Sequence, residues 1–214
     1  MLEKTIKAIQ EMDAVVIQAA ETKKKTFEYI NANYRSKSEL INQKIEEMNN
    51  AYNEVCGSAA QKVAEVLEVE VKEAEDKINA IVCAEVPSSF NTDLTVIQAR
   101  QGKMTDYEVE LYVNKYIHNY PATAALNAAL GKEYKKVGLM RIVQPDKLIE
   151  ELNQRKEEIL NMVNAYNPTG YAARLMRTEN NPLENLAARV QSFIDGNFMV
   201  DMDKWKWGTG AIPV

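Results

Sequence analysis

The sequence predicts an all-α protein with a long N-terminal coiled-coil helix or helical hairpin, followed by a compact bundle of short helices. The first of the six prolines is Pro87, and the residues before it include one glycine, so few residues break helices there. Apolar residues in this part recur at alternating spacings of four and three. Beyond it, short apolar patterns alternate with residues that start and stop helices.

The apolar positions of the N-terminal part form a heptad seam, which predicts pairing with another helix. An unbroken helix over residues 1–82 would be about 120 Å long and could not hide this seam in a monomer. A break at residues 31–37 or 49–58, where helix propensity is weakest, would instead give a hairpin. We therefore expect either a homo-oligomer or a hairpin. The seam residues are Leu2, Ile6, Ile9, Val16, Ala20, Phe27, Ile30, Tyr34, Ile41, Met48 and Val55.

Proline, serine, asparagine and aspartate cluster in residues 86–93, which predicts a linker. The expected regions are thus a coiled coil or hairpin in residues 1–85, this linker, and a small helical domain with an aromatic tail in residues 94–214. The last region should begin with a short helix over residues 94–101, with Asp93 as its cap.

Local signals place the other short helices. Thr105 and Glu108 have the spacing of a capping box for a helix over residues 106–119. Three further helices should begin at prolines 121, 145 and 182, because proline suits the first turn of a helix. Only residues 138–143 have strand character, and such a short strand has no evident partner in the sequence.

Composition limits the possible settings of the chain. It has 26 basic and 31 acidic residues, so we do not expect nucleic acid as a partner. No apolar run approaches the roughly 20 residues needed to cross a bilayer, and the N-terminus lacks the apolar core of a signal peptide. We expect a cytoplasmic protein without membrane contact, with Cys56 and Cys83 as free, buried thiols.

Motifs for catalysis or cofactor binding are missing. The single histidine, His118, has no nucleophile motif around it, and the two cysteines lack metal-binding spacing. The glycines near the C-terminus precede no helix, so no phosphate-binding loop is predicted. We expect a non-enzymatic protein without cofactor or metal. A helical enzyme remains an alternative only if acidic residues converge in the fold, and the candidates are Glu108, Glu110, Asp146, Glu150 and Glu151.

Two groups of residues are candidate partner contacts. If any region contacts nucleic acid or an acidic protein, the best candidates are the basic residues Lys132, Lys135, Lys136 and Arg141. Both tryptophans, Trp205 and Trp207, lie in a C-terminal segment without helical periodicity. They either fill the core of the second region or anchor a partner.

The order of these elements, with the segment that begins Lys103-Met-Thr-Asp-Tyr-Glu and runs to about residue 131, resembles small helical structural proteins of phages and prophages of Gram-positive bacteria. Such proteins act in capsid or tail assembly as scaffolding-like or accessory subunits. The resemblance implies a virion-assembly subunit with a viral structural protein as partner, located in the host cytoplasm or the virion.

Together these features predict a structural or assembly protein that oligomerises through its N-terminal heptads and presents a helical domain to a partner. The alternative is a monomeric helical inhibitor or adaptor that closes the seam as a hairpin and binds a host protein through its charged faces.

Overall fold

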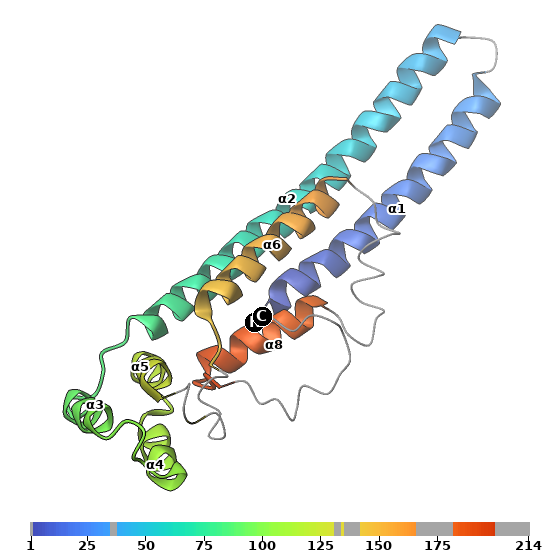
Figure 1. Cartoon of the computed structure of the whole chain (residues 1–214). Helices are drawn as coiled ribbons and strands as arrows, with labels where there is room; N and C mark the ends of the chain where they lie inside the picture. Colours follow the sequence, from blue (N-terminus) through green and yellow to red (C-terminus); the bar gives the residue numbers. More distant parts are fainter. Residues whose placement is uncertain (1, 35–37, 131–133, 135–141, 166–181, 200–214) are drawn as a thin grey trace. The chain divides into compact units, whose positions relative to one another are not determined.

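The computed structural model describes residues 2–34, 38–130, 134, 142–165 and 182–199. Within them the predicted all-α class is confirmed, and a long N-terminal helical region precedes shorter helices (Figure 1). The helices are α1 (Glu3–Asn33), α2 (Ser38–Val82), α3 (Phe90–Ala99), α4 (Asp106–Tyr116), α5 (Tyr120–Leu130), α6 (Pro145–Asn164) and α8 (Pro182–Ile194).

Contacts divide the chain into two compact units. Unit 1 comprises residues 1–72 and 152–184, and unit 2 comprises residues 73–151 and 185–214. The boundary falls inside α2, α6 and α8. The regions 1–85, 86–93 and 94–214 drawn from the sequence stay a prediction.

Unit 1 contains an antiparallel hairpin of α1 and α2 (Figure 1). Thr5 bonds to Glu70, and farther along α1 the Nζ atom of Lys23 lies 4.6 Å from the ring centroid of Tyr52. Rising residue numbers on α1 therefore meet falling numbers on α2. The helical stretch is interrupted between Asn33 and Ser38, the first of the two predicted break positions, while α2 continues through Gly57.

The N-terminus of α1 is capped by a residue of α2. Leu2, at the cap position, has a left-handed backbone with a φ of 61° and offers no side-chain cap. Instead the buried carboxylate of Glu70 accepts hydrogen bonds from the backbone N–H and the hydroxyl of Thr5, each 2.8 Å long, and from the backbone N–H of Lys4 at 3.4 Å. A carboxylate suits this place because helix N-termini carry unpaired donors and a partial positive charge.

Unit 2 is built around α3, α4 and α5, whose apolar faces share one core. Tyr116 is almost fully buried, and its ring meets Phe90 edge to face at 4.9 Å. Tyr134 adds a hydroxyl that accepts from the backbone N–H of Met104 and donates to its carbonyl. The buried members are Phe90, Ile97, Met104, Val109, Val113, Tyr116, Ala122, Leu126, Leu130 and Tyr134.

The predicted capping box is confirmed, since the Thr105 side chain accepts from the Glu108 backbone and Glu108 accepts from the Thr105 backbone. The helix it opens ends at Tyr116, three residues earlier than predicted. The reason is that Asn119 begins the next helix: its side-chain oxygen accepts the backbone N–H of Ala122 at 3.0 Å, which is the bond of an N-cap.

Other predictions need correction. The first helix of this region begins at Phe90 rather than residue 94, because the backbone N–H of Asp93 already donates to the carbonyl of Ser89, which occupies the N-cap position. Asp93 therefore lies inside the helix and is not its cap. Its carboxylate accepts from Lys115 and Tyr116. Cys56 is buried as expected, but Cys83, which follows the end of α2, is exposed; both thiols are free.

The last two residues of the predicted extended segment, Ile142 and Val143, pair with another part of the chain. Ile142 forms an isolated antiparallel bridge with Met199, and the backbone N–H of Val143 donates to the carbonyl of Phe198 at 2.8 Å. Residues 135–141 lie outside the described residues. The partner follows α8 in the chain, so nothing local in the sequence indicates the pairing.

Candidate functional site

The candidate site is the part of the hairpin nearest the break between α1 and α2, which we call the distal hairpin: residues 17–33 of α1 and 38–55 of α2. Within it only Ile30 is buried. The rest of the hairpin in unit 1 has a continuous buried core, formed by Leu2, Thr5, Ala8, Ile9, Met12, Val16, Cys56, Ala60, Val63, Leu67, Glu70 and Val71.

This contrast in burial has a geometrical cause. In unit 1, α6 adds a third helix to the hairpin: Ile159 and Val163 are buried, and Lys156 lies 3.7 Å from Glu68 of α2. The 20 residues of α6 span about 30 Å, whereas the 45 residues of α2 span about 67 Å. Since α6 ends at Asn164, about two turns beyond Lys156, it does not cover the distal hairpin.

An open groove of about 370 Å³ runs between the two helices of the distal hairpin. Phe27 lies in it and remains 44% exposed, although it is a large aromatic side chain. From α2, heptad spacing places Ile41, Ile45, Met48 and Val55 along one stripe, and Val55 is 46% exposed. The residues that line the groove are Ala20, Lys23, Lys24, Phe27, Ile45, Met48 and Asn49.

Charge is distributed unevenly over the distal hairpin. Its α1 part carries three lysines and two glutamates, while its α2 part carries four glutamates and one lysine. Lys44 and Glu47 form a 2.6 Å ion pair on α2, which raises the pKa of Lys44 and lowers that of Glu47. In the described part of the chain, Lys24, Lys25 and Glu54 form no ion pair.

The residues of the predicted oligomer seam differ in exposure. Leu2, Ile9, Val16 and Ile30 are buried, while Ile6, Tyr34, Ile41 and Met48 are half-buried. Ala20, Phe27 and Val55 are exposed. Val55 was predicted to lie in the seam, but the buried side chain at this height of α2 is that of the next residue, Cys56. The oligomeric role of the seam stays a prediction.

The other candidate contacts lie outside the described residues. They are Lys132, Lys135, Lys136, Arg141, Trp205 and Trp207. Sequence reasoning also missed Ile45, because it continued the seam from Ile41 to position 44 before Met48. The spacing of four and then three residues from Ile41 through Ile45 to Met48 was the available signal.

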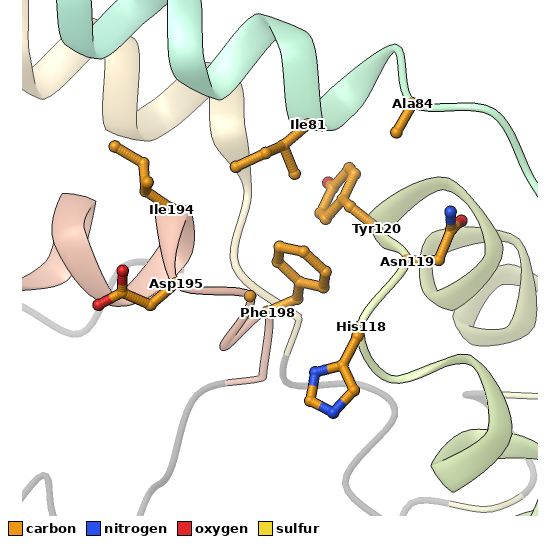
Figure 2. Close-up of a pocket in the computed structure, with 9 residues that line it drawn as sticks. Ile81, Ala84, His118, Asn119, Tyr120, Ile194, Asp195 and Phe198 are labelled. Atoms are coloured by element: carbon orange, nitrogen blue, oxygen red, sulfur yellow. The ribbon is translucent and has the colours of Figure 1, made fainter.

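Unit 2 has a second cavity, of about 390 Å³, beside the end of α5 nearest Tyr120. Figure 2 shows Tyr120 and Phe198 in its middle, beside Ile81, with His118 and Asp195 at its edges. Phe198 and Tyr120 meet edge to face at 5.4 Å, and burial, followed by the charge of Asp146, raises the pKa of Tyr120. The cavity is thus an aromatic hollow with polar residues at its edges.

Two of the five carboxylates proposed for a helical enzyme, Glu108 and Glu151, form ion pairs. Glu108 pairs with Arg100 at 2.8 Å, and Glu151 pairs with Arg189 through two hydrogen bonds. Across the described residues, no three His, Cys, Asp or Glu side chains gather closely enough to hold a metal ion. No helix in that part of the chain is both long and apolar enough to cross a bilayer.

No protein-family model matches the chain, and neither the curated proteins nor the solved structures contain a match.

Proposed function

We propose that the chain is a non-enzymatic structural or assembly protein that oligomerises through its N-terminal hairpin and presents its helical domain to a protein partner. The observation that carries this proposal is the distal hairpin, whose apolar heptad stripe is left uncovered by the described residues over several helical turns. Monomeric proteins seldom keep such surfaces in water, and exposed apolar patches commonly mark interaction sites.

The second half of the proposal is supported by α4 in unit 2. Tyr107 and Leu111 lie one turn apart on this helix and are 68% and 52% exposed. Large side chains at this spacing form one face of a helix, and tyrosine is a frequent anchor residue in protein interfaces. This face provides a contact for a partner that does not involve the hairpin.

The narrower proposal is a virion-assembly or accessory subunit of a phage, acting in the host cytoplasm or in the virion. Its support is the resemblance in element order and in residues 103–131. Mass spectrometry of purified procapsids and virions from the strain that encodes the chain tests it. Detection of the chain at stoichiometric amounts is the expected result, and its absence from both particles contradicts the proposal.

Oligomerisation is tested by light scattering over a concentration series. We expect the wild-type mass to exceed the 24.2 kDa of one chain and to rise with concentration. The variant Phe27→Ser/Met48→Ser removes two apolar side chains from the groove and should stay at the mass of a monomer. The matched control is Val69→Ser, because Val69 is 55% exposed on the same hairpin but lies outside its distal part.

A wild-type monomer at every concentration would contradict oligomerisation and favour a second candidate, a monomeric inhibitor or adaptor. One observation supports this candidate: α1 and α2 pair within a single chain. The part of the seam outside the distal hairpin therefore needs no second copy. The adaptor would then use its groove for a host protein.

A further inference from the structure

The distal hairpin has a polarity of charge that indicates how two copies would meet. We propose that its groove is filled by the groove of a second copy, with the two hairpins side by side, their tips at the same end, and α1 of each against α2 of the other. This inference rests on the proposed oligomerisation and specifies its surface and geometry.

The occupant follows from shape and chemistry. The groove is open to solvent and has apolar side chains on both walls, Phe27 on α1 and Ile45 and Met48 on α2. Two such hairpins placed face to face form a four-helix bundle, in which each helix buries its stripe against the others. A second copy supplies two helices of matching length and an identical stripe, as a self-complementary twofold interface requires.

Two twofold arrangements can bring the grooves together. A twofold axis along the hairpin sets α1 against α2 of the partner, with both tips at one end. A twofold axis across the hairpin sets α1 against α1 and α2 against α2, with the tips at opposite ends. Neighbouring helices are antiparallel in both arrangements, so helix direction does not distinguish the two arrangements. The distribution of charge does.

Charge favours the axis along the hairpin. Lys23 lies at the level of Tyr52, so Lys24 and Lys25 lie at the height of the α2 segment between Glu47 and Glu54. In the first arrangement these lysines face that acidic segment of the other copy. In the second, basic α1 meets basic α1 and acidic α2 meets acidic α2, and such like-charge contacts disfavour an interface.

The test uses three variants measured by sedimentation equilibrium. Lys24→Glu/Lys25→Glu makes the α1 side acidic, and Glu46→Lys/Glu54→Lys makes the α2 side basic. The third variant carries all four substitutions. Lys23 and Glu47 are left unchanged because they make contacts within the chain.

Each double variant should raise the dissociation constant of the dimer about tenfold or more, because like charges then face each other across the interface. The fourfold variant should return to within a few-fold of wild type, since α1 and α2 have exchanged charge and again complement each other. Its recovery would also show that the substitutions are compatible with folding. Added salt should weaken the wild-type dimer and strengthen the two double variants.

The outcomes separate the two proposals. If wild type dimerises but the double variants bind as tightly, or the fourfold variant fails to recover, the geometry is wrong while oligomerisation stands. In the crosswise arrangement the α1 double variant would only exchange one like-charge contact for another, so its dissociation constant would not change. A monomeric wild type would overturn oligomerisation itself.

Discussion

Replacing Glu70 should destabilise the hairpin far more than replacing a nearby surface glutamate. The buried carboxylate accepts three hydrogen bonds from the first turn of α1. A hydrogen bond to a charged group contributes about 1.5–3 kcal/mol, and an unsatisfied buried donor costs about 1–3 kcal/mol. Both bonds from Thr5 are short, whereas the bond from Lys4 is long and weak. We therefore expect Glu70→Ala to lower the free energy of unfolding by about 3 kcal/mol.

Glu70→Gln should cost less, about 1–2 kcal/mol, because the amide oxygen can keep both bonds from Thr5 while the charge at the helix N-terminus is lost. Urea unfolding followed by circular dichroism measures these differences, and hydrogen exchange at the Thr5 amide localises them. The matched control is Glu68→Gln, because Glu68 lies two residues before Glu70 on α2 and is mostly exposed. We expect this substitution to lower the free energy of unfolding by less than about 1 kcal/mol. If Glu70→Ala unfolds like this control, Glu70 does not cap α1.

Two further predictions concern unit 2. The bonds from Lys115 and Tyr116 hold the pKa of Asp93 below its usual 3.8, so its carboxylate stabilises the fold above pH 3.8 and this contribution is lost as pH falls through the lowered pKa. Asp93→Asn should therefore unfold more easily than wild type at neutral pH and equally easily in strong acid, as urea titrations across pH would show. Tyr134→Phe leaves the backbone of Met104 without its two hydrogen bonds and should cost about 1–3 kcal/mol, measured by thermal unfolding. An unchanged midpoint would refute it.

The predictions that succeeded depend on signals within a few residues of each other. The capping box of Thr105 and Glu108, the helix starts at Pro145 and Pro182, and the interruption after Asn33 all follow from local backbone chemistry. A cap, a proline or a weak helix former acts on its own turn of helix. The sequence alone is therefore sufficient to place such features.

The features that were missed are pairs formed across long stretches of chain. Glu70 caps a helix 65 residues away. Ile142 bridges to Met199, which lies beyond both α6 and α8 in the chain. Asp93 was expected to cap its own helix but binds α4 instead. In each case the residue type permits the contact, and only the fold brings the partner within reach.

The candidate site combines both situations. Heptad spacing indicates an apolar stripe, but it does not indicate how far a third helix extends along that stripe. The stripe is apolar beyond the end of α6, and this mismatch in length creates the exposed groove. An exposed surface of this kind cannot be predicted from either helix of the hairpin alone, because it depends on where the covering helix α6 ends.

The exposed groove also makes the folding of the distal hairpin dependent on its surroundings. In a lone chain its helices bury only Ile30 among their described residues. Their other support is local, such as the pair of Lys44 with Glu47 and the contact of Lys23 with Tyr52, and such exposed contacts contribute little to stability. Most helical stability in proteins comes from packing of an apolar face. A second hairpin in the groove would supply that packing, so association and ordering of this segment should be coupled. The rest of the hairpin in unit 1 already packs its own core with α6, so its folding does not depend on a second copy.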